Sequence, residues 1–299
     1  MLGAWTKLEA GLACGAELAY RAQVLKSLMR AAMPSQARPK VSVVTVNFNM
    51  ADQIAGTLDS VFAQDYPNFE SIVIDGASTD GSQEIIAAYS DRLAYWTSER
   101  DRNLYDGMNK GVRAATGEWV LFMNSGDRFA DSHVLSAMFS ENHADADALY
   151  GHHMRRYPKQ GIDRVIHAEA PNVLPLRMHC SHQSLFMRRE ILLERPFSLR
   201  LLAADYEAIL HAYVIGRRFK LVNCVVAVAS VGGRSDTNRL TILWQRISIL
   251  RRHGLMNFKI AIHYAGLIAW VMFASPVKKL LPKSLLTYIL RNRPLKGLG

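Results

Sequence analysis

Short apolar runs in this sequence end in acidic and amide side chains, which suit the binding of cations and nucleotides. The clearest run covers residues 119–123 and stops at a small polar turn whose last residue is Asp127. Five apolar residues between turn signals are typical of a strand that is buried on both faces. Open parallel sheets bind their ligands just beyond the carboxyl ends of the strands. Because a carboxylate there can hold a divalent cation, and the cation can hold phosphates, we expect a metal ligand at Asp127.

Four more polar residues, Thr45, Asn47, Asn49 and Asp75, stand at or near the ends of the first two expected strands. The carboxyl ends of parallel strands face one crevice, so these side chains should lie together. There Asp75 could accept hydrogen bonds from a nucleobase or a ribose. The alternative is that Asp75 only begins a turn, while Asp80 caps the next helix, which is the favoured role of Asp80. The glycine patterns of dinucleotide sites and P-loops do not occur, which disfavours both kinds of site.

The polar loop at residues 100–110 runs into an expected helix and is rich in charged and amide groups. From this position Asp106 and Asn109 could grip a nucleotide or a sugar. Asp106 could equally pair with Lys110 on the helix surface, because residues four apart lie on the same face. Both interpretations stay open.

A histidine and an acid in the second half of the chain are further candidates. His182 and Gln183 precede an expected strand, and Asp205 opens an expected helix. The helix dipole also favours an acid in the first turn, so Asp205 could be purely structural. Four other histidines have no convincing metal-ligand spacing and are given no role: His152, His153, His167 and His179.

The order of elements along the chain predicts the scaffold that would bring these residues together. Four strands are expected, at residues 41–46, 69–74, 93–97 and 119–123. Amphipathic helices alternate with these strands, and the last of the helices is expected at residues 105–115. This alternation is typical of a doubly wound α/β fold with a parallel sheet. Past Asp127 the alternation is less regular. Further strands are expected near residues 148–150, 184–187 and 220–228, and further helices near 131–139, 189–193 and 205–215.

Charge and cysteine content bound the class of protein. The chain has 299 residues and a net charge of +10, but residues 234–299 hold 12 Lys/Arg and one acid, which leaves −1 for the rest. A basic tail can indicate nucleic acid or an anionic membrane surface as a partner. The 3 cysteines form no C-x-x-C pair. Neither a zinc site nor a disulfide framework is indicated, and a reducing cytosol is the simplest compartment.

Residues 41–127 resemble the nucleotide-binding half of the family 2 glycosyltransferases, which have the GT-A fold. The matching segments are 41–49 (Val-Ser-Val-Val-Thr-Val-Asn-Phe-Asn), 57–61 (Thr-Leu-Asp-Ser-Val), 75–82 (Asp-Gly-Ala-Ser-Thr-Asp-Gly-Ser), 108–111 (Met-Asn-Lys-Gly) and 115–119 (Ala-Thr-Gly-Glu-Trp). Three later segments resemble the bacterial polysaccharide members: His182-Gln183, Asp205-Tyr206 and Gly232-Gly233-Arg234-Ser235. The resemblance therefore runs from Lys40 to Ser235.

The resemblance implies a GT-A domain at residues 40–235, with a nucleotide-binding half at 40–127 and an acceptor half at 128–235. It implies an inverting enzyme that moves a sugar from a nucleotide diphosphate donor, a UDP-sugar, to an acceptor hydroxyl. The nucleotide would contact Thr45, Asn47, Asn49, Asp75, Asp106 and Asn109.

The same resemblance assigns the reacting groups. Asp127 would bind the Mg²⁺ or Mn²⁺ that offsets the charge of the leaving diphosphate. Asp205 would be the general base, and His182 and Gln183 would contact the donor or acceptor sugar. One departure is that the usual Asp-x-Asp reads Asn-Ser-Gly at residues 124–126. Asn124 can still offer an amide oxygen, but a ligand charge is lost, so metal binding should be weaker or rest on Asp127 alone.

The ends of the chain lie outside the resemblance. Residues 1–39 are expected to be a helical leader and linker, and residues 236–299 a basic amphipathic helical extension. Its apolar stretch at 260–274 is shorter than the ~20 residues that span a bilayer, so it should be interfacial or buried. Basic groups beside it suit an anionic lipid surface at the cytoplasmic face of the membrane, and a polyisoprenoid-linked acceptor would explain such docking. The alternative is a solvated helical cap on the domain.

Two other functions are weighed against the glycosyltransferase. The basic tail could bind nucleic acid, but it carries no matching motif, and its aromatic residues do not alternate with the basic ones as a stacking platform would. The missing Asp-x-Asp could instead mark a catalytically weak or inactive protein that only binds sugar nucleotides. The favoured prediction stays a metal-assisted enzyme with a nucleotide sugar as its partner and no nucleic acid.

Overall fold

The computed structural model describes residues 38–230 and 237–274. The expected leader, the segment Gly232-Gly233-Arg234-Ser235 and the basic residues after 274 lie outside the described residues. By the density of contacts the chain divides into residues 1–38 and 39–299, and the fold below is that of the second unit.

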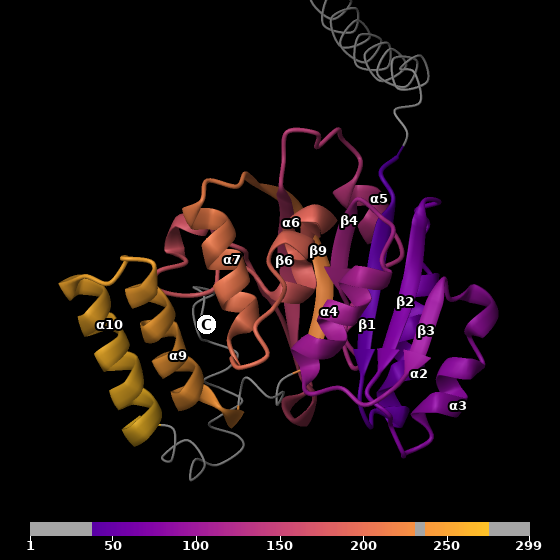
Figure 1. The fold of residues 1–299 in the computed structure, drawn as a ribbon, viewed down its shortest axis with the longest axis horizontal. Helices are drawn as coiled ribbons and strands as arrows, with labels where there is room; N and C mark the ends of the chain where they lie inside the picture. Colours follow the sequence, from indigo (N-terminus) through magenta and orange to yellow (C-terminus); the bar gives the residue numbers. More distant parts are fainter. Residues whose placement is uncertain (1–37, 231–236, 275–299) are drawn as a thin grey trace, which may run out of the picture. The chain divides into compact units, whose positions relative to one another are not determined.

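The first half of the described chain builds a parallel sheet, as the sequence predicts. Strand β1 pairs in parallel with β2 on one side and β4 on the other, and β2 pairs in parallel with β3. The strand order places the ends of β1, β2 and β4 side by side (Figure 1). The strands are β1 (Val41–Asn47), β2 (Phe69–Asp75), β3 (Tyr95–Ser98) and β4 (Trp119–Phe122).

The second half extends the same sheet with mostly antiparallel neighbours. β8 runs antiparallel to β4 and to β6, while β9 runs parallel to β6. Short β5 pairs with β9, and β7 pairs with β6. Together the described residues form a nine-stranded sheet, which makes this an α/β fold with a mixed sheet. The added strands are β5 (Arg128–Phe129), β6 (Ala148–Tyr157), β7 (Ile162–Ile166), β8 (Leu185–Arg188) and β9 (Phe219–Ser230).

Helices cover both faces of the sheet, because the central strands are apolar on both sides. In β1, Val44 and Val46 pack under α4, whereas Val41 and Val43 belong to the core on the opposite face, with residues of α2 and α5. The helices are α2 (Ala51–Phe62), α3 (Ser82–Ala87), α4 (Leu104–Ala114), α5 (Val134–Met138), α6 (Arg189–Glu194) and α7 (Ala204–Val214).

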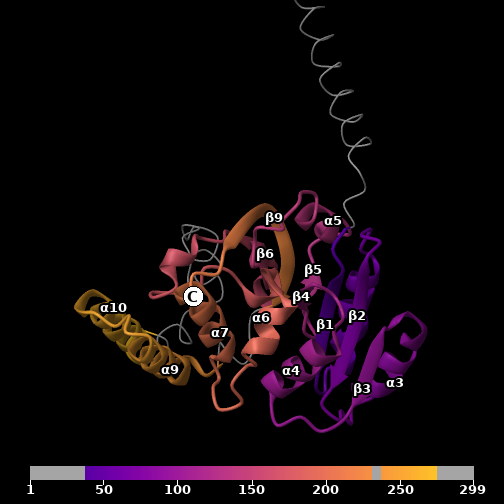
Figure 2. The same ribbon diagram turned by 45° about the horizontal axis from the view of Figure 1, so that its top comes forward.

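Two further helices and a π-helical turn complete the described chain: α9 (Arg239–Arg252), α10 (Phe258–Ala269) and η5 (Trp270–Ala274). Figures 1 and 2 show α9 and α10 side by side beyond α7, at the end of the sheet away from β3. Leu243, Ile247 and Leu250 of α9 and Ile260 and Tyr264 of α10 are buried in the same core as α7. The pair is therefore packed on the domain.

Most element positions agree with the sequence expectation, and the differences have local causes. The helix expected at 131–139 is only the five-residue α5, and the strand expected at 148–150 continues to Tyr157 because β7 folds back against it. Strands β5 and β7 were not expected. β5 has two residues, too few for any periodicity, and β7 contains Asp163 and Arg164.

Helix α4 is held in register over the sheet by one cap and one close contact. The side-chain oxygen of Asn103 accepts hydrogen bonds from the backbone nitrogens of Tyr105 and Asp106, which satisfies free donors at the helix start. Gly111 faces Val44 so closely that a Cβ there would lie 2.2 Å from Cγ1 of Val44. Glycine thus lets α4 lie against β1, which fixes where Tyr105 and Asn109 point.

Candidate functional site

Asp75 lies at the end of β2 and is completely buried. Oδ1 accepts hydrogen bonds from Asn47 Nδ2 at 2.7 Å and Ser78 Oγ at 2.5 Å. Oδ2 accepts from the Ser78 backbone at 2.9 Å and Ser98 Oγ at 2.5 Å. Burial alone would raise the pKa of Asp75, but the hydrogen bonds from Ser78, Ser98 and Asn47 lower it below the ordinary value. The carboxylate is ionised and organises the loop that follows β2.

The network around Asp75, which includes Ser98 at the end of β3, joins the ends of four strands. Asn47 at the end of β1 donates to Asp75. It also accepts a hydrogen bond of 2.7 Å from the hydroxyl of Ser125, a residue in the turn that follows β4. Asn49 accepts from the backbone of Thr79 at 2.9 Å and has a left-handed backbone with φ 50°. The structure thus brings Asn47, Asn49 and Asp75 together at one edge of the sheet.

Two residues at the end of β1 differ in exposure: Thr45 is buried, whereas Phe48 is exposed. Thr45 is fully buried, and among the described residues its Oγ1 has no hydrogen-bond partner. It lies behind the strand end and not on the crevice surface. Phe48, which the sequence analysis did not single out, exposes 54% of its surface beside Gly76. Its place between two asparagines at a strand end is the signal that could have identified it.

Asn109 and Asp106 on α4 make protein contacts. Asn109 is buried, and its amide exchanges two hydrogen bonds of 2.9 Å with the backbone nitrogen and oxygen of Phe197. Asp106 accepts from the Arg102 backbone at 3.1 Å. These contacts place Asn109 as a clamp between the two halves of the domain.

The alternative pairing of Asp106 with Lys110 is wrong. Lys110 Nζ lies 2.7 Å from Asp101 and 2.8 Å from Glu99. Asp101 is nearly buried, and burial raises its pKa against the opposing effect of Lys110. Lys110 therefore supplies the counter-charge for Asp101, whose side chain is much less exposed than that of Glu99.

Asp80 contacts the start of a helix, but the expected N-cap role is wrong, because Gly81 is the N-cap residue of α3. It accepts from the backbone and side chain of Ser82 and from the backbone nitrogen of Ala51 at 2.9 Å. One carboxylate thus serves the first turns of both α3 and α2.

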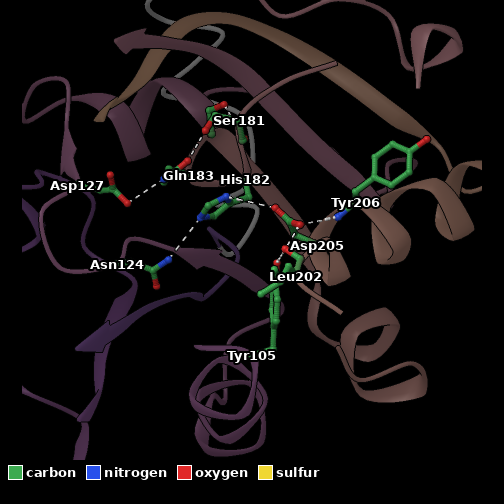
Figure 3. Close-up of polar contacts among 10 residues, drawn as sticks. Tyr105, Asn124, Asp127, Ser181, His182, Gln183, Leu202, Asp205 and Tyr206 are labelled. Atoms are coloured by element: carbon green, nitrogen blue, oxygen red, sulfur yellow. Dashed lines mark hydrogen bonds and ion pairs between the residues drawn. The ribbon is translucent and has the colours of Figure 1, made fainter. Parts of the chain in front are cut away.

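The second group of candidates forms one chain of contacts across the crevice (Figure 3). Gln183 Nε2 donates to Asp127 Oδ2 at 2.9 Å, while Asn124 Nδ2 lies 3.3 Å from His182 Nε2. His182 and Gln183 belong to the short turn η4 (His182–Ser184), which comes from the second half of the domain. The structure therefore brings the predicted metal ligands and the predicted sugar contacts together.

Asp205 is the last residue in this series of contacts. His182 Nδ1 lies 3.6 Å from Asp205 Oδ2. Oδ1 of Asp205 accepts from the Tyr206 backbone at 2.8 Å. The hydroxyl of Tyr105 lies 3.1 Å from the same oxygen and 2.9 Å from the Leu202 carbonyl, so its one hydrogen is shared between these two acceptors. Both His182 and Asp205 keep 25% of their side-chain surface exposed. The carboxylate is thus held in place and still reachable.

The contacts of His182 favour one tautomer. An amide nitrogen only donates, so Nε2 of His182 accepts from Asn124, and the ring hydrogen sits on Nδ1 facing Asp205. Asn124 Oδ1 is buried and has no hydrogen-bond partner among the described residues. That oxygen is therefore available to a ligand.

Asp127 and Asn124 fit a hard divalent cation. Burial raises the pKa of Asp127, and His182 and Gln183 only partly oppose this. Its Oδ1 makes no hydrogen bond among the described residues, so one carboxylate oxygen and one amide oxygen are free. The part of the chain that the structure describes holds no cluster of three or more His, Cys, Asp or Glu suited to a metal. Mg²⁺ often takes one or two protein oxygens and completes its shell with water and substrate phosphates.

Two further features border this chain of contacts. An apolar pocket reaches His182 and Asp205 and is lined by Met108, Val120, Phe122, Leu185, Met187, Leu192, Phe197 and Ile209. His153 on β6 was given no role, yet burial, together with Arg155, His182 and His152, lowers its pKa to about 4. Its buried Nδ1 has no partner among the described residues. His153 is therefore neutral beside His182, a proximity that sequence spacing does not reveal.

Residues 42–202 match the family model described as Glycosyl transferase family 2. The chain is 31% identical over 227 residues to an uncharacterised glycosyltransferase of Mycobacterium tuberculosis, which covers 72% of this chain and 85% of the relative. Among solved structures, S. aureus TarS in complex with UDP has a TM-score of 0.57 at 21% identity, covering 78% of this chain and 72% of that one. A mannosyltransferase from Pyrobaculum calidifontis in complex with GDP-Man and Mn²⁺ has a TM-score of 0.58 at 21% identity, covering 94% and 84%.

Proposed function

The chain belongs to glycosyl transferase family 2 and has the GT-A fold. From that premise we propose that it moves a sugar from a UDP-sugar donor to a hydroxyl of a lipid-linked glycan in polysaccharide biosynthesis. The transfer inverts the configuration at the anomeric carbon. One observation carries the proposal. Gln183 binds Asp127 while the adjacent His182 contacts Asp205. Two acids from opposite halves of the domain thereby flank one turn, as a reaction between a donor and an acceptor requires.

Asp205 is the general base of this proposal. Its carboxylate takes the proton of the acceptor hydroxyl while that oxygen bonds to the anomeric carbon. The bond between this carbon and the diphosphate oxygen breaks, and its electron pair leaves with the diphosphate. A single displacement of this kind inverts the anomeric centre. The partial exposure of Asp205 allows a hydroxyl to come within the hydrogen-bond distance that a base needs.

His182 and Tyr105 orient the base. The Nδ1 hydrogen of His182 faces one oxygen of Asp205, and the Tyr105 hydroxyl lies at the other. Burial, with Asp205 nearby, raises the pKa of Tyr105 far above its ordinary value, so this phenol stays protonated. The two oxygens of Asp205 are thereby fixed in direction.

Asp127 and Asn124 would hold the Mg²⁺ or Mn²⁺. When bound, a divalent cation offsets the negative charge that develops on the leaving diphosphate. Asp127 contributes its free oxygen, and Asn124 contributes the buried amide oxygen that has no protein partner in the described chain. The Mn²⁺ in the mannosyltransferase structure supports this assignment for the shared fold.

The nucleotide would occupy the edge formed by the ends of β1 and β2. The network of Asp75, Asn47 and Ser125 fixes this edge, and Asn49 shapes the loop beside it. The exposed ring of Phe48 offers a face on which a nucleobase can stack. UDP in the TarS complex supports uracil as the base.

The acceptor is proposed to be lipid-linked, which would place the reaction at the cytoplasmic face of the cell membrane. The two segments His182-Gln183 and Asp205-Tyr206, which resemble bacterial polysaccharide members, now lie at the reacting side of the crevice. Within residues 38–230 and 237–274, no helix is long and apolar enough to cross a bilayer.

A donor screen tests the proposal. Purified full-length protein is titrated with UDP-sugars and GDP-sugars, with and without Mn²⁺, and nucleotide release is then followed with a lipid extract as acceptor. We expect metal-dependent binding of a UDP-sugar and release that requires the extract. Binding without release for every acceptor would favour the second candidate, an inactive sugar-nucleotide binder, which Asn124 at the usual acid position motivates. Absence of any nucleotide binding would refute both.

A further inference from the structure

The outward face of α10 and η5 is apolar along its whole length. Three large side chains are strongly exposed on it: Phe258 at 82%, Ile262 at 57% and Phe273 at 73%. Lys259, Trp270 and Met272 are exposed as well. The small exposed positions between the three large side chains are Ala261, Ala265, Gly266 and Ala269. Spacings of three and four residues place these side chains on one stripe of the helix.

The inward face of α10 is apolar as well. Ile260 and Tyr264 are buried against the domain, and Leu267, Ile268 and Val271 pack beside them. A surface helix of a globular protein normally carries polar residues on the side away from the core, and a helix that is apolar all round is normally buried. The outward stripe of α10 therefore fits an apolar partner.

The charge around the stripe identifies the partner. The described residues 237–274, which contain α9, α10 and η5, hold five Lys and Arg and no acid. Arg251 and Lys259 flank the turn between α9 and α10, are exposed, and make no ion pair among the described residues. Apolar side chains beside exposed cations match a bilayer with anionic headgroups. A second copy of the chain would bring like charges together across the same face.

We propose that α10 and η5 dock on an anionic lipid bilayer, with Phe258, Ile262 and Phe273 in the interface and Arg251 and Lys259 at the headgroups. α10 has 12 residues and η5, which continues it, has 5. Together they are shorter than the ~20 residues that span a bilayer, so we place the helix in the plane of the surface. The docking surface is distinct from the residues that bind donor and metal.

The docking helices are joined to the element that carries the proposed base. Gln245 on α9 accepts hydrogen bonds from the backbone of Leu202 at 2.8 Å and Ala203 at 3.1 Å, directly before α7 begins. The guanidinium of Arg246 lies 4.8 Å from the centre of the Tyr206 ring. Docking of α10 therefore also holds Asp205 near the bilayer, where a lipid-linked hydroxyl arrives. Only this last step rests on the proposed function.

Vesicle sedimentation of the full-length protein tests the docking. Vesicles of phosphatidylglycerol and phosphatidylcholine are compared with vesicles of phosphatidylcholine alone. We expect binding to the anionic vesicles that weakens with added salt. The triple variant F258S/I262S/F273S should bind at least roughly tenfold more weakly, because its interfacial side chains are lost. The matched control I215S/L221S, which removes two exposed apolar side chains elsewhere, should bind as the wild type does.

A charge variant keeps the test decisive if the triple variant folds poorly. R251Q/K259Q leaves every apolar side chain in place and should weaken binding roughly fivefold or more, at about 1 kcal/mol for each cation near the surface. Wild-type binding by both sets of variants would overturn the proposal, as would equal binding to neutral vesicles. Sedimentation velocity gives the third outcome: a wild-type dimer that the triple variant dissociates would make the stripe an interface between copies. None of these measurements uses a sugar donor, so a failure here leaves the proposed reaction untouched.

Discussion

His182 Nδ1 lies 3.6 Å from Asp205 Oδ2, and the same ring meets Asn124 through Nε2 at 3.3 Å. The imidazole thus contacts a proposed metal ligand, Asn124, through one nitrogen and the proposed base, Asp205, through the other. Its two contacts fix the tautomer, with the hydrogen toward the carboxylate. A ring nitrogen that faces Asp205 at this point orients the carboxylate. The reaction can therefore be divided experimentally into donor binding at one end of the ring and deprotonation at the other.

Replacement of Asp205 should separate donor binding from turnover. We expect Asp205→Asn to lower kcat by roughly 10²–10⁴-fold, the usual contribution of a general base, while the dissociation constant of the donor changes little. Calorimetric titration with the UDP-sugar and an assay of nucleotide release measure the two quantities. If Asp205→Asn keeps wild-type turnover, Asp205 is not the base.

Tyr105 should act only through Asp205. Tyr105→Phe keeps the ring, which packs 5.8 Å from that of Phe197, and removes the hydroxyl at Asp205. We expect kcat to fall by roughly 3–10-fold, in line with one lost hydrogen bond, with the KM of the donor unchanged. In Asp205→Asn protein the same change should have no further effect on kcat. Independent, additive losses in the double variant would show that Tyr105 acts elsewhere.

Metal binding should weaken as the pH falls. Because burial raises the pKa of Asp127, protons compete with the metal at a higher pH than they would at an ordinary aspartate, whose pKa is about 3.9. Calorimetry with Mn²⁺ and UDP at a series of pH values should show that the affinity falls at a higher pH than it would at an ordinary aspartate. Asp127→Asn should bind Mn²⁺ weakly at every pH. Asn124→Asp supplies the opposite change, since a second carboxylate should strengthen Mn²⁺ binding. Equal Mn²⁺ affinity in all three proteins would remove this pair from the metal site.

The sequence predicted the parallel half of the sheet because its strands and helices are local, regular patterns. It also placed Asn47, Asn49 and Asp75 at one edge, since that follows from strand ends alone. The pairing of Asn109 with Phe197 joins residues 88 apart, and that of Tyr105 with Asp205 joins residues 100 apart. No periodicity encodes such contacts. The role of Asn109 as a clamp between halves therefore emerged only from the folded structure.

The same limit explains the second half of the domain. Strand β9 runs parallel to β6 but antiparallel to β5, and neither direction can be read from apolar residues. The position of His153 beside His182 depends on that arrangement. Local chemistry was easier to anticipate: Asp80 at the start of a helix and the small polar turn before Asp127 both follow from residue types.

Glu70 should stabilise the fold in a pH-dependent way. It is nearly buried and contacts Lys40, Ser42 and the Thr116 backbone at 2.6–2.7 Å. Burial would raise its pKa, but Lys40, Ser42 and Thr116 hold the pKa at about 2, below the ordinary 4.5. The depressed pKa means that this stabilisation is complete above pH ~4.5 and is lost as the pH falls toward ~2. It amounts to about 3 kcal/mol.

Urea unfolding of Glu70→Gln tests this linkage. At pH 7 the variant should lose about 1–3 kcal/mol of unfolding free energy, and the difference from wild type should shrink as the pH approaches 3. Glu84→Gln is the matched control, because Glu84 is exposed and lies on a neighbouring surface helix. A difference from wild type that is the same at pH 7 and pH 3 would contradict the assigned role.

The close approach of α4 to β1 should tolerate no methyl group at Gly111. In Gly111→Ala the new Cβ would lie 2.2 Å from Val44 Cγ1, a fully buried atom that has no room to move. Overpacking of this kind costs about 1–3 kcal/mol, which outweighs the gain of up to about 1 kcal/mol from the better helix former. Urea unfolding should therefore show a net loss. Gly266→Ala is the matched control, since nothing lies within 4 Å of its added Cβ, and there the helix propensity should give a net gain.

A double-mutant cycle with Val44 distinguishes steric overlap from any other cause. Val44→Ala alone leaves a cavity and should also destabilise the protein. Combined with Gly111→Ala, the new methyl group enters the vacated space, so the double variant should be more stable than the sum of the single changes by roughly 1–2 kcal/mol. Because α4 carries Tyr105 and the Asn109 clamp, the double variant should also recover the kcat that Gly111→Ala loses. Additive free energies would mean that α4 is not held at its distance from β1 by this contact, and the placement of Tyr105 against Asp205 would need another cause.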